Sequence, residues 1–164
     1  MKEARDNGSQ IFVFGNGGSS ATAAHLACDL VKGTSYQRDK RFRVIALTDN
    51  IQTITAYSND VCYEDVFVEQ LKNFVNKNDL VIALSGSGNS ENVIKTIDYA
   101  NKKGCRTIGL SGRDGGRLKV HIKRVFFRLG FVEKDSSVAK VVYKARSIHQ
   151  KTSDMSHQKF IYIY

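Results

Sequence analysis

Short apolar runs alternate with helical patterns along residues 11–110, and this alternation constrains the fold more than any other feature. The apolar runs are rich in β-branched and aromatic residues, as buried strands are. They cover residues 11–14, 42–47, 80–84 and 105–110. The helical patterns between them cover residues 20–31, 51–58, 63–75 and 91–103. Strands that alternate with helices predict a parallel sheet covered by helices on both faces.

Two of the expected helices carry an apolar face at helical spacing. In residues 63–75 this face comprises Val66, Phe67, Gln70, Leu71 and Phe74. In residues 91–103 it comprises Val93, Ile94, Ile97 and Ala100. We therefore predict an α/β domain of three αβα layers, whose flavodoxin-like parallel sheet has the strand order 2-1-3-4.

Two loops rich in glycine, serine and asparagine follow the first and third expected strands, at residues 15–20 and 85–90. Glycines such as Gly17 let the backbone approach a ligand closely, while hydroxyls, N–H groups and a helix N-terminus favour an anion. In the expected strand order, the first and third strands flank the topological switch point, so both loops would lie over one crevice. The sequence therefore predicts a site for a phosphorylated small molecule.

Each loop also has a competing interpretation. Helix capping explains Ser90 on its own, but it does not explain the cluster of Ser85, Ser87 and Ser90. The first loop nearly matches a dinucleotide fingerprint, with Asp49 as a possible ribose ligand. Ser20, however, replaces the third glycine of that fingerprint, and a dinucleotide would leave the serine loop unexplained. The two loops together favour a sugar phosphate.

His25 and Asp29 are four residues apart, so they share one face of the helix that follows the first loop. They are either a metal-binding or acid–base pair directed into the crevice, or a surface pair that supports the helix. Their spacing does not decide between these two interpretations. Asp49 is likewise explained by turn chemistry as long as it is considered alone.

Composition excludes several classes of protein. Ten Lys/Arg and three Asp/Glu lie in residues 119–164, so most of the net charge of +9 belongs to this segment. The rest of the chain shows no nucleic-acid recognition motif, which argues against a nucleic-acid-binding protein. No apolar stretch approaches the roughly 20 residues of a membrane span, and the charged N-terminus does not resemble a signal peptide. Three cysteines lie far apart in apolar patterns. We expect reduced, buried thiols in a cytoplasmic protein.

Six motifs occur in the order found in one family of sugar-phosphate enzymes. They are residues 14–19 (FGNGGS), 25–30 (HLACDL), 47–49 (LTD), 57–60 (YSND), 85–93 (SGSGNSENV) and 112–116 (GRDGG). Through them, residues 8–118 resemble the phosphoheptose isomerases, which are sugar isomerase (SIS) domain proteins. The resemblance implies interconversion of sedoheptulose 7-phosphate and D-glycero-D-manno-heptose 7-phosphate through an enediol, toward the heptose of bacterial surface lipopolysaccharide.

The resemblance also implies roles for individual residues. Ser85, Ser87 and Ser90 would hold the phosphate, with Asn16, Gly17 and Ser19 on the facing loop. Asp49 would contact sugar hydroxyls. His25 and Asp29 would bind zinc and take part in catalysis, within a homotetramer.

The sequence departs from the family pattern at several places. The family commonly has Glu where this chain has Asp29 and Thr where it has Gly86. A C-terminal helix with a Gln and a His that complete the family's site is not found in residues 120–164. We therefore expect an SIS core at residues 1–118, and a divergent segment at residues 119–164 that is frameshifted, truncated or replaced. The alternative function is a non-catalytic SIS domain that binds a sugar phosphate or a protein partner.

Overall fold

The computed structural model describes residues 1–112 and 114–122, together with the backbone of residues 125–128. Its strands are β1 (Gln10–Gly15), β2 (Arg43–Ala46), β3 (Leu80–Ser85), β4 (Arg106–Ser111) and β5 (Val125–Arg128). Its α-helices are α1 (Lys2–Asp6), α2 (Gly18–Cys28), α3 (Ile51–Asp60), α4 (Val66–Lys72), α5 (Glu91–Lys102) and α6 (Leu118–His121). A π-helical turn (Asp29–Gly33) continues α2, and a 3-10 turn (Tyr63–Asp65) precedes α4.

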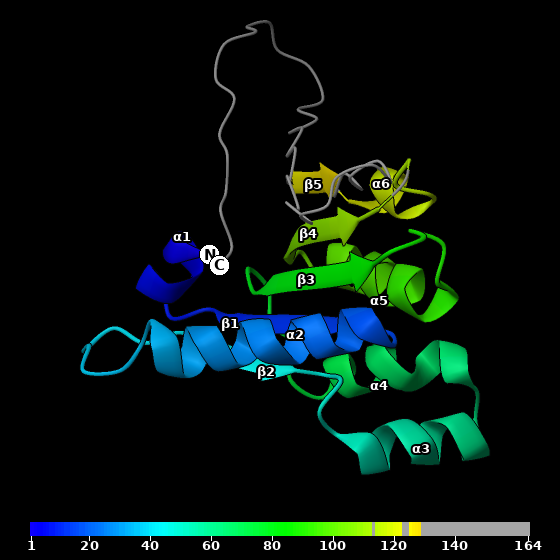
Figure 1. Cartoon of the computed structure of the whole chain (residues 1–164), viewed down its shortest axis with the longest axis horizontal. Coiled ribbons are helices and arrows are strands. Elements are labelled where there is room, and N and C mark those ends of the chain that lie inside the picture. The colour runs from blue at the N-terminus through cyan, green and yellow to red at the C-terminus, as the bar shows by residue number, and fades with distance from the viewer. Residues whose placement is uncertain (113, 123–124, 129–164) are drawn as a thin grey trace, which may run out of the picture.

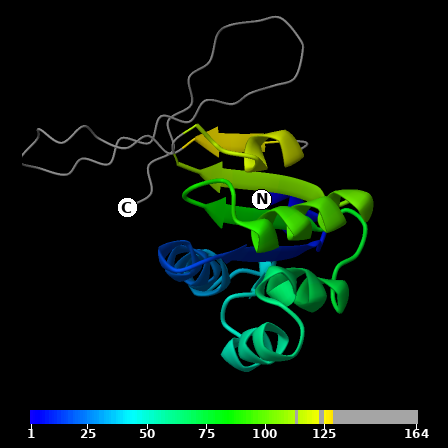
Figure 2. The same ribbon diagram turned by 90° about the vertical axis from the view of Figure 1, so that its right-hand side faces the viewer.

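The five strands form one parallel sheet in the order β2-β1-β3-β4-β5. Figures 1 and 2 show α2 on one face of this sheet and α4 and α5 on the other. The predicted three-layer fold and the predicted 2-1-3-4 strand order are therefore confirmed. The sheet continues past residue 118, where we expected the core to end, because β5 pairs with β4. Predictions for residues 129–164 lie outside the described residues.

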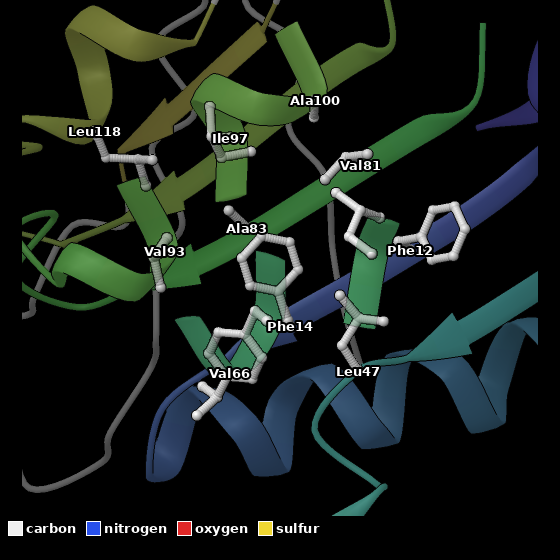
Figure 3. Close-up of a cluster of buried hydrophobic side chains, with 12 residues drawn as sticks. Phe12, Phe14, Leu47, Val66, Val81, Ala83, Val93, Ile97, Ala100 and Leu118 are labelled. Carbon is white, nitrogen blue, oxygen red and sulfur yellow. The ribbon is translucent and has the colours of Figure 1, made fainter. Parts of the chain in front are cut away.

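Alternate residues of β1 face the two helical layers, as the pleat of a strand requires. Phe12 and Phe14 pack among side chains of α4 and α5, including Val66 and Ile97 (Figure 3). Ile11 and Val13 belong to the core on the other face of the sheet. That second core contains Ala4 of α1 with Ala23 and Ala27 of α2. The sheet is thus buried on both sides, which explains why its strands are almost continuously apolar.

The expected helix at residues 63–75 is shorter in the structure, where a 3-10 turn leads into α4 and α4 ends at Lys72. Val66, Phe67, Gln70 and Leu71 are buried as predicted. Phe74 lies beyond the end of α4 and is 54% exposed, so its predicted place on the buried face is wrong. The short helix α1 was not predicted. In the described part of the chain, no helix is long and apolar enough to cross a membrane.

The prediction of three buried thiols is wrong for Cys28, which is exposed, and overstated for the half-buried Cys62 and Cys105. Helix α2 is mildly apolar on all sides, so its sequence does not mark which face lies inward. The structure turns Ala23 and Ala27 toward the sheet and leaves Cys28 in solvent.

This difference predicts selective alkylation of the cysteines. Burial raises the pKa of the Cys105 thiol to about 11, so only about one molecule in a thousand carries the reactive Cys105 thiolate at pH 8. Iodoacetamide at pH 8 should therefore label Cys28 well before Cys105. Labelling of Cys105 should rise about tenfold per pH unit between pH 7 and pH 9. Peptide mass spectrometry measures both rates, and equal labelling of the two thiols would contradict the structure.

Candidate functional site

The two glycine- and serine-rich loops leave the same edge of the sheet side by side. They follow β1 and β3, which pair from Ile11 and Leu80 to Gly15 and Leu84. Strand β2 lies on the far side of β1, so β1 and β3 flank the point where the strand order reverses. This is the place where open parallel sheets bind ligands.

In the second loop, the hydroxyls of Ser85 and Ser90 lie 3.3 Å apart. The Ser85 hydroxyl also accepts a hydrogen bond from the Gly88 N–H at 3.2 Å. Ser90 is the N-cap residue of α5, but its side chain makes no capping hydrogen bond. Capping therefore does not account for this serine in the structure. Ser87 is exposed, and its hydroxyl accepts from the Asn89 N–H at 3.1 Å.

The turn between β4 and α6 packs closely against the serine loop. The Leu118 N–H donates to the Gly88 carbonyl at 2.8 Å, and the Arg117 N–H donates to Asn89 Oδ1 at 3.0 Å. A Cβ on Gly88 would lie 2.1 Å from the carbonyl oxygen of Gly115. Sequence reasoning used residues 112–116 only as one of the six family motifs and missed this contact. The paired glycines on both segments were the signal that could have revealed it.

In the first loop, the side chain of Asn16 is hydrogen-bonded to two residues from other elements. The side-chain amides of Asn16 and Asn92 donate to each other, at 2.9 and 3.0 Å. The Tyr63 hydroxyl donates to Asn16 Oδ1 at 2.9 Å. Asn92 lies in the first turn of α5 and is buried, so it ties the first loop to the helix that follows the serine loop. Sequence reasoning assigned no role to Asn92 or Tyr63.

The other candidates on this edge are more exposed. Gly17 adopts a positive φ of 53° and precedes α2, while Ser19 is partly buried in the first turn of that helix. Asp49 follows β2 and is exposed, and it accepts a long hydrogen bond of 3.5 Å from the Thr48 hydroxyl. Since β2 runs parallel to β1, Asp49 lies at the same edge of the sheet as the two loops.

His25 and Asp29 lie away from the loops. Their side chains are 78% and 56% exposed, and His25 Nε2 lies 3.6 Å from Asp29 Oδ2. Ala23 and Ala27 face the sheet, so His25 projects from the opposite side of α2. It also lies about 10 Å along the helix from Gly18. Within the described part of one chain, His25 and Asp29 are therefore not adjacent to the two glycine- and serine-rich loops.

The pair fits part of a zinc site. Two ligands of a tetrahedral zinc ion, each bound at about 2.0–2.1 Å, lie about 3.3 Å apart, close to the separation of His25 Nε2 and Asp29 Oδ2. Within residues 1–112 and 114–122, however, no three His, Cys, Asp or Glu side chains are grouped so that they could hold a metal ion. The described residues thus offer two ligands, and the remaining ligands would have to come from elsewhere.

A separate polar hollow of about 610 Å³ lies on the outer side of α4 and α5. Its charges balance, since Lys72, Lys95 and Lys102 lie among Glu64, Glu91 and Asp98. Nearby, a hydrogen bond from Lys95 lowers the pKa of Asp65 and raises that of Lys95 itself. None of the candidate site residues lines this hollow. It is therefore distinct from the crevice at the ends of β1 and β3.

A family model described as the SIS domain matches residues 1–112. The chain belongs to the SIS domain family. Among curated proteins, it is 44% identical over 117 residues to the phosphoheptose isomerases of Nitratiruptor sp. and Aliarcobacter butzleri, which covers 71% of this chain. The matched parts make up 62% and 61% of those relatives, so the chain spans less than two thirds of their length.

Solved structures agree with this assignment to the SIS domain family. A phosphoheptose isomerase from Francisella tularensis superposes with a TM-score of 0.73 at 29% identity, covering 84% of this chain and 71% of that one. One from Neisseria gonorrhoeae gives a TM-score of 0.69 at 32% identity, covering 77% of this chain and 65% of that one. The resemblance to phosphoheptose isomerases inferred from the six motifs is confirmed.

Proposed function

We propose that this SIS domain chain is an isomerase that interconverts sedoheptulose 7-phosphate and D-glycero-D-manno-heptose 7-phosphate. The observation that carries the proposal is the convergence of Ser85, Ser90 and Asn16 at the ends of two paired strands. Relatives named phosphoheptose isomerases support a heptose phosphate as the substrate. The reaction would supply heptose for surface lipopolysaccharide, in a cytoplasm where the free thiols stay reduced.

The serine loop would anchor the substrate through its phosphate. The hydroxyls of Ser85, Ser87 and Ser90 can donate to phosphate oxygens, and the N-terminal end of α5 adds partial positive charge. Gly17 and Ser19, at the start of α2, would face the phosphate, and the exposed Asp49 would accept hydrogen bonds from sugar hydroxyls. Fixing the phosphate holds the reacting carbons in one place, which favours proton transfer by lowering its entropic cost.

The chemical step moves a proton between adjacent sugar carbons through an enediol, so it needs a base near both carbons. Asp29 is the candidate base, and His25 lies beside it to orient the carboxylate. His25 and Asp29 would hold a zinc ion, which would supply positive charge to a substrate oxygen that becomes negative during the proton transfer. The fit of the His25–Asp29 separation to two zinc ligands supports this role.

A homo-oligomer, and specifically a tetramer, would bring His25 and Asp29 of one copy to the loops of another. Two features of the helices support this. The outward side of α2 exposes Ala21, Cys28 and His25, and Val31 in the following turn is 49% exposed. Helix α3 has no buried residue, and Ile51 at its start is 63% exposed. Exposed apolar side chains such as Val31 and Ile51 would be buried if a second copy packed against these helices.

A second function is favoured by the separation of His25 and Asp29 from the loops within one chain. The chain would then bind a sugar phosphate, or a protein partner, without turning the sugar over. Incubation with sedoheptulose 7-phosphate, with and without added zinc, separates the two functions. Formation of the aldose supports the isomerase, while tight sugar-phosphate binding without product supports the binding protein. Binding of neither sugar phosphate nor inorganic phosphate would overturn both.

Replacing Ser85 tests the phosphate site itself. Ser85→Ala should weaken binding of inorganic phosphate about tenfold, since a hydrogen bond to a charged group contributes about 1.5 kcal/mol. Isothermal titration calorimetry gives the dissociation constant. Ser58→Ala removes an exposed hydroxyl on α3 that bonds only within its own helix, and serves as the control. An unchanged affinity in Ser85→Ala would remove Ser85 from the site.

A further inference from the structure

Two side chains from other elements converge on the amide of Asn16. Asn92 comes from α5, Tyr63 from the turn before α4, and Asn16 itself from the loop after β1. The three hydrogen bonds among them are 2.9 to 3.0 Å long. Asn92 is only 3% exposed, whereas Tyr63 is 49% exposed at the rim. This network joins the first loop to α5, the helix that follows the serine loop, although nothing in the sequence motifs assigns it a role.

The network uses most of the bonding capacity of the Asn16 amide. A side-chain amide has two N–H donors and a carbonyl oxygen with two lone pairs. Both lone pairs of Asn16 Oδ1 are occupied, one by the Asn92 amide and one by the Tyr63 hydroxyl. One of the two N–H groups of Asn16 donates to Asn92 Oδ1. Asn16 therefore retains one N–H donor and no free acceptor.

We propose that Tyr63 and Asn92 are positioning residues that make Asn16 a pure hydrogen-bond donor to a substrate oxygen that carries no hydrogen. Such an oxygen belongs either to the phosphate or to the carbonyl group that becomes the enediolate. A sugar hydroxyl can accept from this N–H but finds no free acceptor on Asn16 for its own hydrogen, so this position favours an oxygen that only accepts. The inference rests on the proposed binding of a sugar phosphate, and it adds the chemical identity of the atom that Asn16 contacts.

The test is a double-mutant cycle on the full chain. Tyr63→Phe removes one hydroxyl and leaves the ring in place. The second substitution of the cycle is Asn16→Ala. Tyr36→Phe is the control, because it makes the same atomic change at a tyrosine that is 65% exposed in the segment before β2. For each variant we would measure the dissociation constants of sedoheptulose 7-phosphate and inorganic phosphate, the kcat and KM of isomerisation, and the midpoint of thermal unfolding.

In the unaltered chain, we expect Tyr63→Phe to lower kcat/KM about tenfold, or to lower the affinity for the sugar phosphate by that factor if there is no turnover. In the Asn16→Ala background, the same substitution should have an effect of less than about twofold. Asn92→Leu should show the same dependence with a larger loss. A parallel loss of inorganic phosphate affinity assigns the oxygen to the phosphate. A fall in kcat with unchanged phosphate affinity assigns it to the carbonyl.

Equal effects of Tyr63→Phe in both backgrounds would overturn the positioning role. Asn16→Asp retains acceptors but has no donor, so full activity in that variant would overturn the donor role. If the unaltered chain binds no sugar phosphate, the proposed function fails and the donor role fails with it. The unfolding midpoints are independent of ligand, so coupling between Asn16 and Tyr63 in those data would still identify the network as a structural one.

Discussion

Gly88→Ala is expected to destabilise the domain by about 3 kcal/mol and to abolish phosphate binding. Gly88 has a φ of +69°, which an L-residue adopts only with strain, and its added Cβ would lie 2.1 Å from the Gly115 carbonyl oxygen. That oxygen is backbone, so relief requires the turn before α6 to move away from the serine loop. The midpoint of thermal unfolding should fall by about 6–12 °C.

Gly86→Ala is the matched control for this substitution. Gly86 lies in the same loop, but nothing lies within 4 Å of the position of its Cβ, and its φ is not in the left-handed region. We expect its unfolding midpoint and its phosphate affinity to stay close to those of the unaltered chain. If both alanine variants behaved alike, contact with the turn at residues 115–118 would not determine the shape of the loop.

His25→Ala and Asp29→Asn should each lower kcat/KM for sedoheptulose 7-phosphate by about 10³-fold, within the range expected for loss of an acid–base group. Both side chains are more than half exposed, so the free energy of unfolding should change by less than about 0.5 kcal/mol. Inorganic phosphate should still bind, because the serine loop does not contact either residue. Steady-state kinetics, calorimetry and thermal unfolding check these three expectations.

Zinc binding separates a catalytic pair from a surface pair. The unaltered chain should bind zinc, and each of the two variants should lose it, as measured by calorimetry with the metal alone. Lys32→Ala, in the exposed turn that follows Asp29, is the control and should retain both zinc and activity. Full turnover in His25→Ala would contradict the catalytic role and favour a pair that only supports α2.

Much of the fold could be predicted because the apolar runs are short, β-branched and regularly spaced. The pattern located β1 to β4 within a few residues and predicted their order in the sheet. Local patterns failed where packing is not periodic. Phe74 follows the helical spacing of α4 but lies beyond its last turn, and Cys28 belongs to a helix whose sides differ little in polarity.

The candidate site was predictable to the extent that it depends on adjacent residues in the sequence. Ser85 and Ser90 share one loop, and their hydroxyls lie 3.3 Å apart at the end of β3. The contacts of Asn16 with Asn92 and Tyr63 span 76 and 47 residues, and no spacing rule reports contacts of that range. The capping interpretation of Ser90 was equally reasonable from sequence, and only the direction of its hydroxyl excludes it.

The sequence alone determined the class of the domain, its strand order and the two loops at the switch point, because these follow from local hydrophobic period and turn chemistry. The tertiary structure decided which side chains meet. It packed the glycines of two distant turns against each other, occupied the acceptor positions of Asn16, and turned His25 and Asp29 outward. Each of these outcomes depends on how elements far apart in the chain pack together. Local sequence patterns do not predict such contacts.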